Sequence, residues 1–248
     1  MKTLTALSGA LLIAALAAPA SAQYPTPHDR YVAVNAASQP GSTALSDHFE
    51  FERNVETATA DVHYPSKLGV GFDAGAGIRL WKRLGAGLSL SYLSSTGAAS
   101  IDASIPHPFM FDRPRLINGT EDSITRTETG AHAQLLYFVP ARGKLRLVLS
   151  GGPSWLRLEQ DFVTDVHYSE SYPYDTATFT RATTTSAKGS AIGFNAGADV
   201  RWMFNRRLAA GALVRLTRAQ VDIDLATGRT VTVDAGGVQA GAGLRFLF

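Results

Sequence analysis

Residues 70–80 read VGFDAGAGIRL, and their side chains alternate strictly between two kinds. Every even position is apolar, whereas every odd position is glycine, aspartate or arginine. Successive side chains of a β-strand point to opposite faces, so the stretch predicts a strand with one apolar face and one small or charged face. An amphipathic strand of a soluble sheet gives the same pattern. The rest of the chain must therefore decide between a membrane-spanning strand and a strand of a soluble sheet.

The alternation recurs along the chain and predicts eight strands. They cover residues 31–36, 70–80, 84–92, 131–139, 145–155, 192–204, 208–216 and 238–248. Most have the about 9–11 residues that a tilted strand needs to cross a bilayer. Residues 193–203 repeat residues 71–81 at six of eleven positions, which leads to the hypothesis of a duplicated four-strand unit.

The links between these segments alternate in length. Residues 81–83, 140–143 and 205–207 are short links, whereas residues 37–68, 95–127, 158–190 and 218–232 are long and polar. Short turns on one side and long loops on the other are typical of outer-membrane barrels. The predicted fold is all-β: a transmembrane antiparallel up-and-down β-barrel of eight strands, with short periplasmic turns and long extracellular loops.

Both ends of the chain indicate export. Residues 1–22 combine Lys2, an apolar run and a final Ala20-Ser21-Ala22, which predicts a signal peptide cleaved before Gln23 and a barrel domain over residues 23–248. The apolar run is too short to span a bilayer. At the other end, Gly243, Phe246 and Phe248 resemble the terminal signal read by the outer-membrane assembly machinery, although Gly241 stands where that signal usually has a polar residue.

Taken together, these features resemble the OmpA/OmpX-type outer-membrane β-barrel domain. The resemblance covers nearly all of residues 31–248 and implies a bacterial outer-membrane location. It also implies outer-membrane lipid and the assembly machinery as partners, and a monomer. The likeness is architectural and carries no function with it.

A barrel of eight strands has an interior just wide enough to be filled by side chains. Alternation points ten polar residues into it: Asp73, Arg79, His132, Gln134, Arg146, Asn195, Asp199, Arg201, Arg215 and Arg245. Isolated charges there would be costly, so we expect a network of ion pairs and hydrogen bonds. This favours a plugged lumen, with a narrow conducting pathway as the alternative.

Aromatic residues should gather at the two membrane interfaces. The predicted girdle consists of Trp81, Tyr137, Trp202 and Phe204 near the short-turn ends, and Tyr92 and Trp155 near the long-loop ends.

Several function classes lack support in the sequence. The chain has no cysteine and therefore no disulfide framework. Without residues 1–22 it keeps 22 basic against 21 acidic side chains, so nothing indicates a nucleic-acid partner. The glycines of residues 69–77 lie within a strand, unlike those of a phosphate-binding loop. His132 lacks a serine two residues on, the pair that a lipid A deacylase of this size uses. Histidines 63, 107 and 167, with nearby aspartates, could bind a metal, but strand extensions explain them better.

We therefore predict a non-enzymatic protein with no catalytic residue, metal site or cofactor. Its role is structural or depends on contacts made by the extracellular loops, where the aromatic residues 168–179 suit a protein or glycan ligand. The alternatives are a small-solute or hydrophobic-molecule channel and a lipid-modifying enzyme.

Overall fold

The computed structural model describes residues 30–40, 44–140, 143–225 and 228–248. The predicted signal peptide lies outside these residues and stays a prediction. All regular secondary structure in the described part is strand, and no described helix is long and apolar enough to cross a membrane. The ten strands are β1 (Arg30–Gln39), β2 (Leu45–Arg53), β3 (Glu56–Tyr64), β4 (Gly69–Trp81), β5 (Leu84–Ile105), β6 (Arg115–Val139), β7 (Leu145–Glu170), β8 (Ala177–Met203), β9 (Leu208–Asp224) and β10 (Thr230–Leu247).

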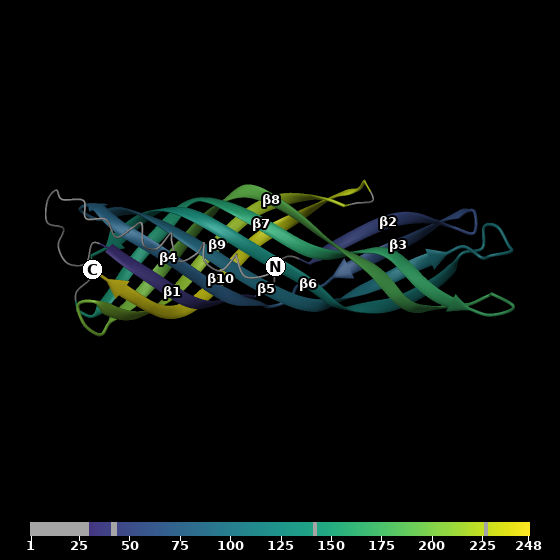
Figure 1. Cartoon of the computed structure of the whole chain (residues 1–248), viewed down its shortest axis with the longest axis horizontal. Coiled ribbons are helices and arrows are strands. Elements are labelled where there is room, and N and C mark those ends of the chain that lie inside the picture. Colours follow the sequence, from purple (N-terminus) through teal and green to yellow (C-terminus); the bar gives the residue numbers. More distant parts are fainter. Residues whose placement is uncertain (1–29, 41–43, 141–142, 226–227) are drawn as a thin grey trace, which may run out of the picture.

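Eight of these strands, β1 and β4–β10, form a closed antiparallel ring (Figure 1). The ring closes because β1 pairs with β10, from Tyr31 opposite Leu247, and β5 pairs with β6, from Leu84 opposite Tyr137. The predicted up-and-down barrel is confirmed. Strands β4 and β8, which carry the repeated phrase, lie four positions apart in the ring and therefore on opposite walls.

The predicted long loops are wrong in length. β7 continues to Glu170 and β8 begins at Ala177, so only residues 171–176 connect them, and residues 106–114 connect β5 to β6. The predicted loop 37–68 contains the extra hairpin β2–β3, whose second strand pairs with β5 over Thr59–His63. The barrel is thus prolonged well beyond the apolar band as a group of strands (Figure 1).

The sequence concealed this extension because the polarity of the strands reverses along their length. In β9, Val214 and Leu216 are exposed and Arg215 is buried, whereas Val221 and Ile223 farther along are buried and Asp222 between them is exposed. The alternation keeps its phase, but the apolar face becomes the inner one. The alternation that predicts a membrane strand has an apolar outer face. Segments whose outer face is polar do not match that pattern and are therefore predicted as surface loops.

We call the prolonged region the crown. It consists of β2, β3 and the ends of β5–β10 that lie farthest from the short turns, which we call their far ends. Hydrogen-bonded pairing of β6 with β7 ends at Arg126 and Gln160, and that of β8 with β9 ends at Phe194 and Arg218. The crown therefore divides into the sheet β2-β3-β5-β6, the hairpin β7–β8 and the hairpin β9–β10.

These three sheets enclose an apolar core. Its fully buried side chains include Phe162, Val163, Ile101, Ile105 and Val221. The ring of Tyr64 packs edge-on to Phe162 with centroids 5.9 Å apart, and its hydroxyl oxygen accepts a hydrogen bond from the Val163 N–H at 2.8 Å. Burying each large apolar side chain contributes about 1.5–3 kcal/mol. Hydrophobic packing therefore takes over where the hydrogen-bonded ring divides.

Ion pairs bridge the sheets of the crown. Arg53, at the end of β2, donates to both carboxylate oxygens of Asp165 in β7 at 2.8 and 2.9 Å. Arg229, beside β10, donates to the carboxylate of Asp47 in β2 at 2.9 Å and to the His48 carbonyl at 3.1 Å. These contacts link segments that no strand pairing joins.

Candidate functional site

The middle of the barrel interior is organised around Arg215 of β9. Its guanidinium donates to the Asp73 carboxylate at 2.7 Å and to the Ser89 hydroxyl at 2.9 Å, and Asn35 donates to the same carboxylate at 3.1 Å. Arg215 and Asp73 are almost fully buried. A buried charge is stable only when it is paired and hydrogen-bonded, so this group acts as a structural unit that ties β1, β4, β5 and β9 together.

A second ionic group lies nearer the short-turn end. Asp199 of β8 accepts from Arg201 at 2.7 Å and from Arg245 of β10 at 2.7 Å. Arg201 also lies over the ring of Tyr31, 3.7 Å from its centroid. On the opposite wall, Arg79 lies over the ring of Phe138 at 4.5 Å. The two arginines of the repeated phrase thus both stack on an inward aromatic ring.

A chain of neutral polar side chains runs through His132 of β6. One ring nitrogen lies 3.0 Å from the Ser91 hydroxyl, and the other lies 2.8 Å from the Ser154 hydroxyl. Asn195 donates to Ser154 at 2.8 Å and accepts from Gln134 at 3.2 Å. Both ring nitrogens of the buried histidine are therefore engaged by serine hydroxyls, and neither remains for the carboxylate that a serine-hydrolase arrangement requires.

Buried side chains flank the polar interior in both directions. Toward the crown, Glu128 accepts from Arg126 at 2.6 Å, and beyond them lies the apolar core. Toward the short turns, Tyr31, Leu136, Phe138 and other apolar side chains form a second buried cluster. A cavity of about 30 Å³ lies among the polar groups. Because one water needs roughly 10–15 Å³ of such volume, it has room for about two waters.

Nine of the ten residues predicted to face the lumen lie inside the barrel, and one does not. Arg146 lies in the inward-facing phase of β7, but its side chain is exposed. It is only the second residue of the strand, where a long side chain reaches past the rim to solvent. Several partners were absent from the prediction although alternation points them inward, namely Asn35, Ser89, Ser91, Ser154 and Gln239. Gln39 and Glu128 lay outside the predicted strands.

The predicted girdle residues are all partly or largely exposed: Trp81, Tyr137, Trp202, Phe204, Tyr92 and Trp155. The first four lie at or near strand ends on the short-turn side. Tyr92 and Trp155 lie in the middle of β5 and β7, at the level where the outer face changes from apolar to polar. Phe246 and Phe248, from the predicted assembly signal, are also exposed on the short-turn side. Gly243, from the same signal, packs closely against the backbone of β1. A Cβ at this position would lie 1.9 Å from the Val34 carbonyl oxygen.

Outside the apolar band, exposed large apolar side chains concentrate at the tip of the crown. They come from three turns that are distant in sequence and from the start of β6: Val55, Phe109, Met110, Phe111, Leu116 and Tyr172. Phe109 packs edge-on against Tyr174, with ring centroids 5.4 Å apart, and Tyr174 likewise contacts Tyr172 at 6.2 Å. We call this set, with Tyr174, the aromatic tip.

The crown histidines have protein partners. His63 hydrogen-bonds with Ser46, His167 with Thr183, and His107 accepts from the backbone N–H groups of residues 109 and 110. The described residues contain no group of three or more histidine, aspartate or glutamate side chains placed to hold a metal.

Comparison with known proteins assigns the chain to a family. The model of the outer membrane protein beta-barrel domain matches residues 8–246. The chain belongs to the outer membrane protein beta-barrel domain family. This is the family expected from the alternating strands and the ends of the chain. Barrels of this kind keep their short turns on the periplasmic side, and the crown lies at the end of the strands opposite those turns.

One solved structure shows the same fold at low sequence identity, and two others have a weaker likeness. The outer membrane protein OprG of Pseudomonas aeruginosa is 10% identical with a TM-score of 0.50, over 89% of this chain and 96% of OprG. Ail, the attachment invasion locus protein of Yersinia pestis, is 11% identical with a TM-score of 0.40, over 89% of this chain and 100% of Ail. The outer membrane protease OmpT of Escherichia coli is 6% identical with a TM-score of 0.44, over 92% and 99% of the two chains. No curated protein matches the sequence.

Proposed function

We propose that this outer-membrane barrel is a non-enzymatic, monomeric surface protein that does not conduct solutes and that contacts an extracellular protein or glycan through its aromatic tip. The proposal rests on the apolar core of the crown. That core closes the extracellular end of the barrel, and it also holds three separate turns in one place. A binding surface made from distant turns needs such a rigid support.

The interior supports the absence of conduction. A solute crossing the barrel would have to displace the crown core, the Glu128–Arg126 pair and the Arg215–Asp73 group in turn. Fully buried side chains such as Phe162, Leu158 and Leu136 stand in that path. Conductance measurements in planar bilayers should therefore show no discrete currents from the purified protein. Discrete currents would instead favour the alternative, a narrow pore or solute channel.

The chemistry of the tip supports the binding role. Exposed aromatic side chains are enriched at protein interfaces, where they supply contact area at a small entropic cost. Phe109 and Phe111 are about three-quarters exposed and Tyr172 is 87% exposed. Large exposed apolar groups collected from three turns indicate an interaction site more strongly than singly scattered ones.

A comparison of displayed variants tests the binding role. Cells lacking the native protein would display either the wild type or the variant Phe109→Ser/Phe111→Ser/Tyr172→Ser, and both would be applied to immobilised glycans and matrix proteins. We expect the wild type to be retained on at least one surface and the tip variant to lose retention. A control variant with three polar changes on the crown wall, Asp102→Ser/Lys188→Ser/Gln220→Ser, should behave like the wild type. Equal retention of the wild type and the tip variant on every surface would contradict the proposal.

The lipid-modifying alternative has a direct assay. Ser91 and Ser154 approach His132 closely, but all three side chains are buried inside the barrel. Incubating the protein with lipid A should release no acyl chains. Release that depends on His132 would overturn the non-enzymatic assignment.

A further inference from the structure

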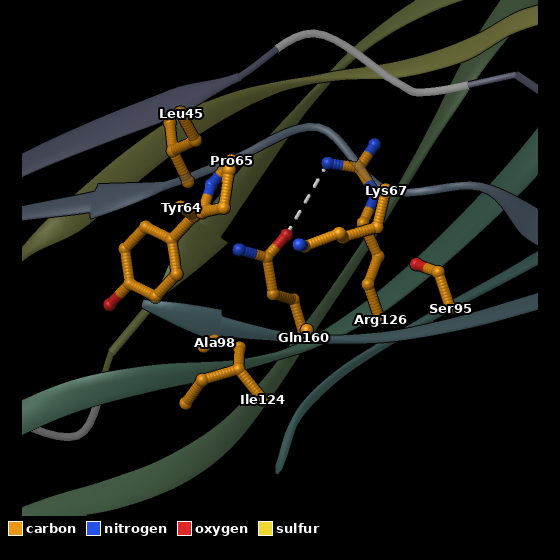
Figure 2. A pocket seen from close by; sticks show the side chains of 10 residues that line it. Leu45, Tyr64, Pro65, Lys67, Ser95, Ala98, Ile124, Arg126 and Gln160 are labelled. Atoms are coloured by element: carbon orange, nitrogen blue, oxygen red, sulfur yellow. Dashed lines mark hydrogen bonds between the residues drawn. The ribbon is translucent and has the colours of Figure 1, made fainter. Parts of the chain in front are cut away.

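A second cavity, of about 40 Å³, lies where the membrane barrel meets the crown. Pairing of β4 with β5 ends at Val70 opposite Ser94, and pairing of β3 with β5 begins at His63 opposite Ser100. The stretch of β5 between these points has no strand on that side. The chain from β3 to β4 crosses the gap, and the cavity lies beneath it. Its lining includes Lys67, Ser95, Arg126 and Gln160 (Figure 2).

The side chain of Lys67 enters this cavity. Its aliphatic stem lies against Gly97 of β5, because a Cβ at residue 97 would be only 2.8 Å from the Lys67 Cγ and 2.9 Å from its Cε. Figure 2 shows the ammonium group pointing toward Gln160. A side chain at residue 97 would therefore displace the lysine stem from this position. The backbone at residue 97 has no positive φ, so steric room and not backbone strain explains the glycine.

The cavity has an excess of positive charge. Arg126 is neutralised by Glu128, which accepts from its Nε at 2.9 Å and from its Nη2 at 2.6 Å. Gln160 accepts from the remaining nitrogen of Arg126 at 3.4 Å. Among the residues that the structure describes, no carboxylate forms an ion pair with Lys67. Lys67 is exposed, so its charge lies at the mouth of the cavity without a carboxylate partner among the described residues, and the other groups of the site include hydrogen-bond donors.

The cavity lies at the level of lipid headgroups. Lys67 precedes the exposed Leu68, which lies just before β4, and Val70 is the first exposed apolar side chain of β4. Phe72 of β4 stacks on Tyr92 of β5 at 5.5 Å, in the aromatic layer that marks the outer interface. The volume accommodates about three water-sized groups, the number of free oxygens on a phosphate monoester.

We propose that this cavity binds a phosphate group, with Lys67 as the principal cation and Arg126, Ser95 and Gln160 as further hydrogen-bonding groups. A lipid phosphate of the outer leaflet and a free phosphate share this chemistry. Retention of lipid A by the purified variants distinguishes between these two sources. The site does not depend on the aromatic tip or on closure of the lumen.

Titration of the full chain tests the site itself. The protein is purified in a maltoside detergent, inorganic phosphate is added, and the methyl signal of the lining residue Ile124 is followed by NMR. We expect a saturable shift whose apparent affinity falls at least about tenfold in Lys67→Gln, because the variant loses a charge-assisted hydrogen bond to the phosphate. Gly97→Ala keeps the charge but displaces the lysine stem, so it should weaken binding too. Lys188→Gln, which removes an exposed lysine from the outer face of β8, should leave the affinity unchanged.

A second measurement identifies the source of the phosphate. Each variant is placed in phosphatidylethanolamine vesicles containing lipid A, and the lipid A retained on the released protein is counted by native mass spectrometry. Retention that is lost in Lys67→Gln and absent for dephosphorylated lipid A assigns the site to a lipid phosphate. Phosphate binding by NMR with equal retention by all variants assigns it to a free anion. No saturable shift, or the same loss in Lys188→Gln as in Lys67→Gln, would overturn the proposal.

Discussion

At the scale of single residues, the barrel interior depends on buried charges that must be paired. Arg215 and Asp73 lie 142 positions apart in the sequence and form a pair that is almost fully buried. Such a pair is not in itself evidence of high stability, because desolvation opposes the attraction between the two charges. Removing one member, however, leaves the other charge buried without compensation. Substitution of either residue alone should therefore destabilise the protein, even if the intact pair adds little to the free energy of unfolding.

Replacing Arg215 with methionine should lower the free energy of unfolding by about 3–5 kcal/mol, the usual result of breaking a buried ion pair. The double variant Arg215→Met/Asp73→Leu should recover part of this loss, because no buried charge then remains unpaired. Denaturant unfolding in lipid vesicles provides the measurement. Arg218→Met, an exposed position three residues along the same strand, should change the free energy by less than about 0.5 kcal/mol. An equal effect at both positions would contradict this account.

Asp47 in the crown should confer a dependence on pH. Burial raises the pKa of this carboxyl above its ordinary value of 3.8, and the charge of Arg229 only partly opposes the shift. A raised pKa in the folded state means that the folded crown prefers the protonated carboxyl. The stabilisation from this group is therefore complete below pH 3.8 and is lost as the pH rises through the raised pKa.

Wild-type stability relative to Asp47→Asn should accordingly increase as the pH falls from neutrality toward 4. Unfolding of both proteins at a series of pH values measures the difference. Asp102→Asn, at an exposed position of β5, serves as the control for general effects of charge removal. A difference between wild type and Asp47→Asn that is constant with pH would show that Asp47 does not titrate in this way.

At the scale of elements, the strands have two halves with different sources of stability. In the membrane barrel, closed backbone pairing holds the ring, and its outer face is solvated by lipid. In the crown, three sheets are held by an apolar core and by bridging pairs such as Arg53–Asp165. Regions with different stabilising interactions commonly open with different free energies.

Phe162→Ala should therefore destabilise the crown selectively. The ring of Phe162 is fully buried, and large-to-small changes of this kind cost about 3–5 kcal/mol. Amide hydrogen exchange should become faster in β2, β3 and the far ends of β5–β10, while protection in the paired segments of the membrane barrel stays unchanged. Phe194→Ala, at a lipid-facing position of β8, is the matched control. A uniform loss of protection in both halves would contradict this division.

At the scale of the whole molecule, the reversal of polarity defines the level of the outer membrane surface. On β9 the outer face changes between Leu216 and Arg218, and on β10 it changes between Asp234 and Val238. These two paired strands place the boundary at the same level, since Val238 lies opposite Leu216; we call this level the belt. The cavity beneath Lys67 lies at this same belt.

The absence of cysteine allows this boundary to be mapped with single labelled positions. A fluorophore attached at Leu216→Cys should be quenched by lipids that carry a quencher in their acyl chains, whereas one at Asp222→Cys should not. Both side chains point away from the barrel and lie on the same strand, so they differ only in height. Strong quenching at residue 222 would place the crown inside the bilayer and contradict the assigned boundary.

The sequence alone was sufficient to predict the barrel, because the alternation of side chains along a strand is a local property. Residues 70–80 already indicate which side chains face lipid, and the same argument placed Asp199, Arg245 and most of the polar lumen on the inner face. The crown could not be predicted in this way, since its strands show the same alternation with inner and outer polarity exchanged, and only their surroundings distinguish them from loops.

The partners of the inward residues were decided by the tertiary structure. Which strands lie opposite one another, and at what height, depends on the register of the closed ring. That register brings Ser91 and Ser154 to His132, Asp73 to Arg215, and Gly97 beneath Lys67. The sequence thus determined the faces of the strands through local periodicity. The closed ring and the packed crown determined the contacts, because these join residues that no local pattern relates.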